Sequence, residues 1–266
     1  MSVRRVVVAW FAVCAAVAQG PPAFRSEVEL VAIPCTVVDA RGTRVDDLQR
    51  EEFRVFDNDV PRNVEFLWHD EDQPLTLGVL IDVSDSQRDI ADEHRATAEA
   101  LLNSLLRPGD GSFVMAFGGA DGSPIWNAVY DAARERLRPV KGNKALLLLT
   151  DGYDTGSAHT WRQAADEAQK SDAAVYAIQY RSSSGRSYAP DLNRLVTETG
   201  GAGFSAPGDL RDVVTRLEID LRRRYVLGFR PERLNLAKVR HEVRVEVTRP
   251  ELTVRAKKSY WETPRK

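Results

Sequence analysis

The sequence feature that most constrains the fold is a short apolar segment, Leu75-Thr76-Leu77-Gly78-Val79-Leu80-Ile81, which carries no charged residue. A segment this short and this apolar is typical of a strand buried on both faces of a parallel sheet. From residue 90 to residue 222 the sequence alternates between helical periodicity and further short apolar segments. This alternation implies right-handed crossovers and predicts an α/β fold, a doubly wound, mainly parallel sheet with helices on both faces.

The individual elements of this region can be placed from periodicity and from the residues that begin and end helices. Pro124 suits the first position of a helix, where its missing N–H is not needed, and Gly200-Gly201 ends another helix. The sequence predicts helices at 90–106, 124–137, 161–170, 192–199 and 210–222, and strands at 75–81, 112–117, 145–149 and 173–180, with a short strand around Phe204.

The segments on either side of this region have the alternating, β-branched patterns of strands. Strands are predicted at 27–31, 33–38, 53–56 and 64–68 and then at 224–229, 242–247 and 252–256, with at most one helical turn around 47–53. Each flank is too small to bury a core alone, so we expect the two to pack together as one discontinuous β domain. The predicted organisation is a signal peptide at 1–18, an N-terminal β segment at 19–72, an inserted α/β domain at 73–222 and a C-terminal β segment at 223–266.

The first eighteen residues have the pattern of a secretory signal peptide. Arg4 and Arg5 precede an apolar stretch at 6–18 that is too short to span a bilayer comfortably. Ala16-Val17-Ala18 gives a small-residue cleavage pattern before Gln19. We therefore expect an extracytoplasmic protein, periplasmic or secreted. Membrane attachment is expected only in the alternative that this segment stays uncleaved as an anchor.

The composition, 43% hydrophobic and 29% charged, is that of an ordinary soluble globular protein. Loss of the signal peptide would remove Arg4 and Arg5 and change the net charge from −2 to −4. A chain with this charge has no overall attraction to nucleic acid, and no nucleic-acid partner is predicted. Cys35 would then be the only cysteine, so an internal disulfide is excluded and a buried, apolar role is expected.

Several other residues are interpreted as structural. The four histidines of the chain lack the spacing of metal ligands. We therefore expect them at the surface. The run Leu221-Arg222-Arg223-Arg224 is expected to be the solvated end of the last helix, and Trp126 is expected to pack in the core. The histidines are His69, His94, His159 and His241.

The residues that point to a function come directly after the first apolar segment. Asp82-Val83-Ser84-Asp85-Ser86 has the pattern D-x-S-x-S. In open α/β sheets, ligands bind at the carboxyl ends of the strands, which is where this loop would lie. One carboxylate and two hydroxyls on a tight loop form an all-oxygen surface, which suits Mg²⁺ better than zinc.

Two further segments are expected beside this loop. Thr150-Asp151-Gly152 follows the strand at 145–149, so that Asp151 would face Asp82 if the two strands are neighbours. Two carboxylates in that position repel each other unless a cation lies between them. Ser123 precedes the helix that begins at Pro124, and its hydroxyl is interpreted equally well as a third metal ligand or as a helix cap.

These motifs resemble those of von Willebrand factor A domains with a metal-ion-dependent adhesion site, and more narrowly those of the VWFA-related proteins of Acidobacteria. The resemblance extends over almost the whole chain after residue 18. It implies that Ser84 and Ser86 bind the metal directly and that Asp82 and Asp151 bind it through water. Ser123 would stand where the family usually has threonine. The matching segments are 31–68, 74–82, 144–152, 174–178 and 224–229.

The chain departs from this family in three ways. Serine replaces threonine at Ser123, and Asp85 stands where the family usually has glycine or another small residue. Only 36 residues separate Ser86 from Ser123, so one antiparallel edge strand and one helix are expected to be missing. A short glycine-rich loop at 118–123 can replace them, because both junctions lie at the same end of the sheet. That loss would expose the edge of the strand at 112–117; the alternative is that Ser123 is no longer held and the site is degenerate.

The sequence therefore favours an exported, metal-dependent protein-binding module without enzymatic activity. Mg²⁺, with Mn²⁺ or Ca²⁺ as alternatives, would be held by Asp82, Ser84, Ser86, Ser123 and Asp151. A carboxylate of a partner protein would complete its coordination. Two other functions stay open: a structural or assembly protein with a degenerate site, and a metal-assisted hydrolase with Asp85 or Asp154 as its base. The sequence predicts neither the partner nor the oligomeric state.

Overall fold

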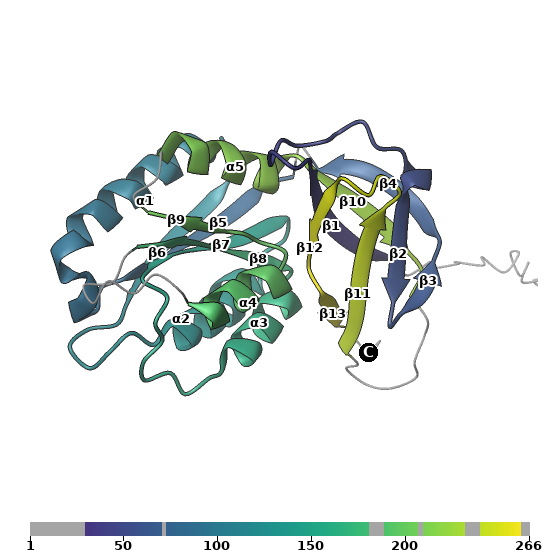
Figure 1. Cartoon of the computed structure of the whole chain (residues 1–266). Coiled ribbons are helices and arrows are strands. Elements are labelled where there is room, and N and C mark those ends of the chain that lie inside the picture. The colour runs from purple at the N-terminus through teal and green to yellow at the C-terminus, as the bar shows by residue number, and fades with distance from the viewer. Residues whose placement is uncertain (1–29, 71–72, 181–188, 207–209, 232–239, 262–266) are drawn as a thin grey trace, which may run out of the picture.

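The computed structural model describes residues 30–70, 73–180, 189–206, 210–231 and 240–261. These residues form two bodies side by side, one of parallel sheet and helices and one of antiparallel strands (Figure 1). The signal peptide predicted at 1–18 and most of the strand predicted at 27–31 lie outside the described residues. Among the described helices, none combines the length and the apolar character needed to cross a bilayer.

The first body is a five-stranded sheet in which every neighbouring pair is parallel. Its strand order is β6-β5-β7-β8-β9. This arrangement confirms the predicted α/β fold class. The strands are β5 (Leu75–Asp82), β6 (Gly111–Phe117), β7 (Asn143–Thr150), β8 (Ala173–Gln179) and β9 (Gly203–Ser205).

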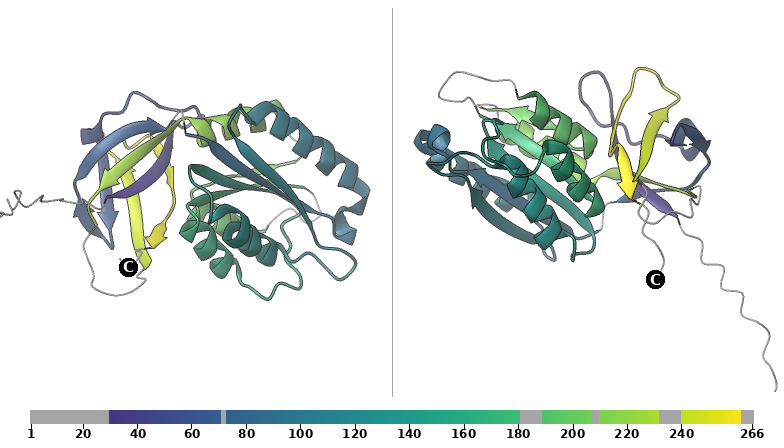
Figure 2. Two further views of the ribbon diagram at one scale, coloured as in Figure 1. Left: turned by 180° about the vertical axis from the view of Figure 1, so that it is seen from behind. Right: turned by 90° about the horizontal axis from the view of Figure 1, so that it is seen from below.

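Helices cover both faces of this sheet (Figure 2). Side chains alternate along β5, so that Leu80 packs toward one set of helices while Leu77 and Val79 pack toward the other. One face is covered by α1 (Ala91–Leu105) and α5 (Leu210–Arg222). The other face is covered by α2 (Ile125–Asp131) with its π-helical continuation Ala132–Leu137, by α3 (Trp161–Lys170) and by α4 (Pro190–Glu198).

The connection between β6 and α2 is as short as the sequence indicates. Residues 118–124 form a loop without strand or helix, and β6 pairs with β5 alone among the described residues. The helix predicted at 90–106 is preceded by a 3₁₀ turn, Asp85–Ile90, which follows directly from the D-x-S-x-S loop.

The second body consists of two four-stranded antiparallel sheets, ordered β12-β1-β10-β4 and β13-β11-β2-β3. Strands from both ends of the chain share each sheet, because β1 lies between β10 and β12 and β11 pairs with β2. The strands are β1 (Val31–Val38), β2 (Phe53–Asp57), β3 (Val60–Arg62), β4 (Val64–Asp70), β10 (Arg224–Phe229), β11 (Arg240–Val247), β12 (Thr253–Ala256) and β13 (Ser259–Trp261). Between them Arg50–Glu52 form one 3₁₀ turn.

The core of the second body fills the space between its two sheets. Ile33, Val55, Leu227 and Phe229 are almost fully buried there. Cys35 is also buried, as expected, and burial raises the pKa of its thiol to about 12. The thiol is therefore protonated at neutral pH and packs as an apolar side chain.

The second body packs against the amino ends of the parallel strands. Arg224 at the start of β10 donates a hydrogen bond to Asn143, the first residue of β7. The backbone N–H of Lys258 donates to the carbonyl of Glu198 at the end of α4. The carboxyl ends of the parallel strands therefore lie at the opposite end of the sheet from this interface.

Two expectations about charged residues are wrong. The run 221–224 is not a solvated helix end, since Arg222 and Arg224 are buried. Their surroundings explain this, because α5 passes directly into β10 where the two bodies meet, and Arg222 pairs there with Asp110. His94 and His241 are fully buried rather than exposed; His241 pairs with Asp57 inside the second body.

Candidate metal centre

The carboxylate of Asp82 is the centre of the candidate site. Asp82 is the last residue of β5 and is fully buried. Its Oδ1 accepts a hydrogen bond from the backbone N–H of Ser84 at 3.0 Å. Its Oδ2 accepts one from the Ser123 hydroxyl at 2.6 Å and one from the Thr150 hydroxyl at 2.7 Å. Two loops and the end of β7 therefore converge on one buried carboxylate at the carboxyl end of the sheet.

The D-x-S-x-S loop turns sharply after the strand. The backbone N–H of Gln87 donates to the carbonyl of Ser84 at 2.9 Å, which begins the 3₁₀ turn. Ser84 is buried beside Asp82, whereas Asp85 is exposed. The side chain of Ser86 lies outside the described part of the structure.

The shortened loop at 118–123 brings Ser123 to Asp82. Gly118 and Gly122 both have positive φ, +86° and +132°, a conformation that glycine adopts without strain. A Cβ at Gly118 would lie 3.3 Å from Asp82 Oδ1, and one at Gly122 would lie 2.6 Å from the Thr155 hydroxyl oxygen. The two glycines therefore allow the loop to pass close to both sides of the site.

Thr155 holds Ser123 from the other side. Its hydroxyl accepts a hydrogen bond from the Ser123 N–H at 2.7 Å, and its own N–H donates to the Ser123 carbonyl at 2.9 Å. Of the two roles considered for Ser123, the helix cap is not observed. Pro124 is the N-terminal cap residue and makes no side-chain capping bond, while the Ser123 hydroxyl is used on Asp82.

The first N–H groups of α2 are instead satisfied by the loop after β7. The N–H of Trp126 donates to Asp154 Oδ1 at 3.1 Å and to the Ser157 hydroxyl at 3.2 Å. Trp126 itself is buried in the core, as expected. The loop that carries Asp151 and the loop that carries Ser123 therefore support each other.

Asp151 lies on the neighbouring strand's loop, as the strand order requires. β7 pairs directly with β5, and Asp151 follows β7 and is buried. Its Oδ1 accepts from the N–H of Tyr153 at 3.1 Å, and its Oδ2 accepts from the Gln87 amide at 3.1 Å. Gln87 thus links the 3₁₀ turn after the D-x-S-x-S loop to Asp151.

Sequence reasoning missed the contribution of Thr150. This residue ends a strand that is otherwise apolar from Ala145 onward, and its side chain is fully buried. A buried hydroxyl requires a hydrogen-bond partner. A threonine at the end of an apolar strand and beside an acidic turn could therefore have been predicted to bond to a nearby carboxylate. The hydroxyl donates to Asp82 and accepts from the N–H of Gly152 at 3.1 Å.

His94 lies behind the site and does not offer it a positive charge. Its Nδ1 is 3.3 Å from the backbone carbonyl of Asp82, and its ring lies 4.2 Å from the ring of Tyr180. Burial lowers the pKa of His94, although the nearby Asp82 opposes this. The imidazole is therefore neutral at pH 7.

The donor set fits a hard cation and does not fit zinc. Among the described residues, no three His, Cys, Asp or Glu side chains form a group that could hold a metal. The groups that do converge are hydroxyl and carboxylate oxygens, which are the ligands of Mg²⁺ and Ca²⁺. A hydroxyl that donates its proton to Asp82 keeps lone pairs for a cation, so Ser123 can serve both groups.

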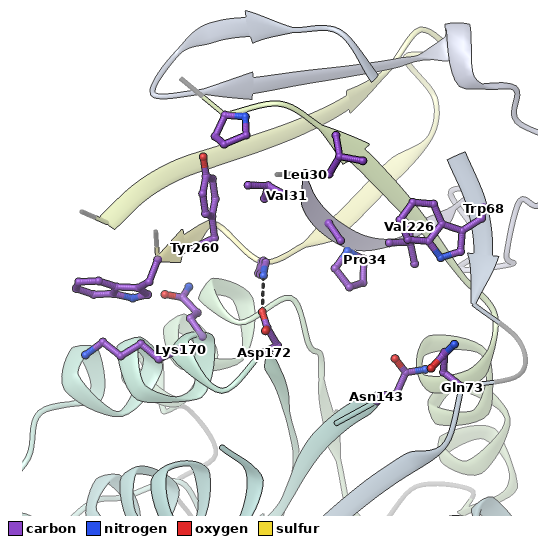
Figure 3. A pocket seen from close by; sticks show the side chains of 16 residues that line it. Leu30, Val31, Pro34, Trp68, Gln73, Asn143, Lys170, Asp172, Val226 and Tyr260 are labelled. Carbon is purple, nitrogen blue, oxygen red and sulfur yellow. Dashed lines mark hydrogen bonds and ion pairs between the residues drawn. The ribbon is translucent and has the colours of Figure 1, made fainter. Parts of the chain in front are cut away.

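A cleft lies at the opposite end of the sheet, between the two bodies (Figure 3). It has a volume of about 570 Å³. Pro34, Trp68 and Val226 line its wall on the second body, and the ion pair between Lys257 and Asp172, 2.8 Å long, crosses it. The cleft borders the amino ends of the parallel strands and is separate from the candidate metal centre.

Comparisons with known proteins yield structural likeness only. No protein-family model matches the chain, and no curated protein matches it. Solved structures of low sequence identity are similar in part. An aerotolerance-related membrane protein from Bacteroides fragilis is 14% identical, with a TM-score of 0.40 over 55% of this chain and 98% of that one.

Two further similar structures come from other organisms. The manganese-loaded TRAP protein of Plasmodium vivax is 13% identical, with a TM-score of 0.41 over 72% of this chain and 96% of that one. The pilus adhesin SpaC of Lactobacillus rhamnosus GG is 9% identical, with a TM-score of 0.43 over 82% of this chain. The match spans 48% of the adhesin. At these scores the likeness carries no argument about function.

Proposed function

We propose that the chain is an exported, metal-dependent protein-binding module. The cation, Mg²⁺ or alternatively Mn²⁺ or Ca²⁺, is held by Asp82, Ser84, Ser86, Ser123 and Asp151. The observation that carries this proposal is the 2.6 Å hydrogen bond between Ser123 and Asp82. It supports the proposal because the short loop at 118–123 brings a hydroxyl to the carboxylate of the D-x-S-x-S motif.

The electrostatics of the site support a cation as its ligand. The three hydrogen bonds to Asp82 come from neutral groups, two hydroxyls and one backbone N–H. No described basic side chain forms an ion pair with this carboxylate, and the nearby His94 is neutral. A buried carboxylate without a counter-charge is costly, and a bound cation would remove that cost.

The neutral hydroxyls also explain why the proposed partner presents an acidic side chain. Ser84 and Ser123 supply oxygens without charge, and the hydrogen bonds to Asp82 and Asp151 hold the two carboxylates in place. A cation bound mainly by neutral groups keeps positive charge for an incoming carboxylate. The proposed partner is therefore a protein that presents an acidic side chain, and the resemblance to adhesion-type A domains is consistent with this.

We propose no catalytic step. Asp154 was one of two candidate bases, but its Oδ1 accepts hydrogen bonds from Trp126 N–H and from the Ser157 hydroxyl and so serves to cap α2. The other candidate, Asp85, has a solvent-exposed side chain.

Isothermal titration calorimetry tests metal binding. We expect saturable Mg²⁺ or Mn²⁺ binding to the wild-type chain and a loss of affinity of ~10- to 100-fold or more in Asp82→Asn and Ser84→Ala. Matched controls are Asp121→Asn, an exposed carboxylate on the shortened loop, and Ser205→Ala, an exposed serine in β9. No heat of binding in the wild type, or equal affinity in all variants, would rule the proposal out.

Affinity capture from the extracytoplasmic fraction tests the partner. The proposed mode predicts that capture requires Mg²⁺, is abolished by EDTA and is lost in Asp82→Asn. Capture that survives EDTA would instead favour the alternative of a structural protein with a degenerate site.

A further inference from the structure

The edge of the parallel sheet at β6 is long, and no described segment covers it. β6 has seven residues, Gly-Ser-Phe-Val-Met-Ala-Phe, none of which is charged or proline. Among the described residues it pairs with β5 only. About half of its backbone N–H and C=O groups therefore face away from the sheet, which makes the edge a template for another strand.

The other edge strands are short or carry the residues that protect such edges. β9, the opposite edge of the same sheet, and β13 each have three residues. β3 contains Pro61 and Arg62, and β12 contains Arg255. β4 contains Glu65, which pairs with Arg230. Short length, proline and charge are the usual protections of an edge, and β6 has none of them.

One face of β6 also exposes apolar side chains. Phe113 and Met115 pack against the core on the side of α2. On the other face Ser112, Val114 and Ala116 are exposed. Val114 is 54% exposed, more than any other exposed large hydrophobic side chain among the described residues.

We propose that β6 pairs with β6 of a second copy of the chain, antiparallel and about a two-fold axis at Val114. The pairing would join two five-stranded sheets into one sheet of ten strands. In this register Val114 lies opposite itself, Phe113 opposite Met115, and Ser112 opposite Ala116.

A second copy fits this edge because the strand is complementary to itself. A two-fold axis places each residue near its own equivalent, so any charge near the axis would meet a like charge. β6 contains no charge, and its exposed face consists of small and apolar residues. The proposed contact is at the side of the sheet and does not use the candidate metal centre.

Light scattering during size-exclusion chromatography of the full chain, in EDTA, tests the proposal. We expect a dimer for the wild type and a dissociation constant raised ~100-fold in Val114→Lys, because two ammonium groups would then meet at the axis. The matched control is Val60→Lys, which places the same charge on an exposed valine of β3. This control should remain dimeric. A monomeric wild type would overturn the proposal. It would do so even if the edge then bound an extended segment of another protein.

Cross-linking tests the register independently. Opposite Cα atoms in antiparallel strands lie about 4.5 or 5.5 Å apart, and both distances allow a disulfide. Val114→Cys should therefore form a covalent dimer on oxidation, while Val60→Cys should not. The experiment uses a Cys14→Ser background, and the other native cysteine, Cys35, is buried and does not compete. A dimer that is unaffected by Val114→Lys and gives no cross-link would place the contact on another surface.

Discussion

Buried carboxylates at the two ends of the parallel sheet are contacted by different kinds of group. At the amino ends of the strands, Asp110 pairs with Arg222 and Asp220 pairs with Arg255. At the carboxyl ends, Asp82 is equally buried but receives hydrogen bonds from neutral groups only. The first end therefore contains its own counter-charges, while the second is organised around a negative charge that nothing described in the chain neutralises.

This difference separates carboxylates that are paired with arginine from one that is not, within one domain. The arginine-paired carboxylates lie where the second body packs, and their pairs hold α5 and β12 in place. The neutral donors around Asp82 fix its position without cancelling its charge. A carboxylate treated in this way is suited to binding a cation from solution, which is why the proposed function is assigned to the carboxyl ends.

The largest expected effect comes from breaking a pair at the amino ends. Arg222→Met would leave Asp110 buried without its arginine, and we expect a loss of about 3–5 kcal/mol in the free energy of unfolding. Chemical denaturation measures this loss, which should not depend on Mg²⁺.

The matched control for this change is Arg107→Met. Arg107 pairs with Glu218 at the surface, where both side chains are about half exposed. An exposed pair of this kind contributes at most about 1 kcal/mol. If the two substitutions were equally costly, the contrast between internally neutralised and surface charge would not hold.

A smaller effect is expected from the pH dependence of Asp220. Burial raises its pKa to about 6 from an ordinary value of 3.8, although Arg255 opposes the shift. The folded state therefore keeps a proton that the unfolded state loses. This proton stabilises the folded state by roughly 2–3 kcal/mol below about pH 4, and the stabilisation is lost as the pH rises through 6.

The measurement is the free energy of unfolding of the wild type and of Asp220→Asn between pH 4 and pH 7. The difference between the two proteins should change by the predicted amount, because asparagine does not titrate. A difference that stays constant over this range would mean that Arg255 neutralises Asp220 as completely as Arg222 neutralises Asp110. Burial opposes the shift at Asp110, but the hydrogen bond from Arg222 and those from two backbone N–H groups lower its pKa.

The smallest effect on stability is expected at the carboxyl ends. Thr150→Val removes the hydroxyl that donates to Asp82 and accepts from Gly152. We expect a loss of about 1–2 kcal/mol in unfolding free energy in EDTA, together with weaker Mg²⁺ binding. Thr197→Val is the control, since that hydroxyl bonds only to an exposed carbonyl within α4. Unchanged stability and affinity would show that Thr150 does not position Asp82.

Much of the fold could be predicted because apolar segments of the sheet are unambiguous. Leu75–Ile81 and Ala145–Leu149 are buried on both faces, and their periodicity leaves little choice of structure. β3 and β13 were missed because three-residue strands carry almost no periodicity, and Pro61 argues against a strand. The burial of Arg222 and His241 depends on packing between distant segments, which no local pattern reveals.

The site was predictable to the extent that its residues follow strand ends. Asp82 and Asp151 were expected on neighbouring loops, and β5 and β7 are neighbours. The role of Ser123 could not be decided from sequence, since capping and binding both suit a serine before a helix. The role that Ser123 takes depends on Thr155, which lies 32 residues further along the chain and holds the Ser123 backbone.

The arrangement of the second body has a consequence for the order of folding. Val31 pairs with Phe229 and Cys35 pairs with Ala256, so β1 can pair only after the whole parallel-sheet region that follows it has been synthesised. The parallel sheet, by contrast, is assembled from a continuous stretch of chain. Non-local pairing is slow, and domains of a growing chain tend to fold in the order in which they are completed. We therefore expect the central sheet to form first and β1 to remain an unpaired, aggregation-prone strand until β10 and β12 have emerged.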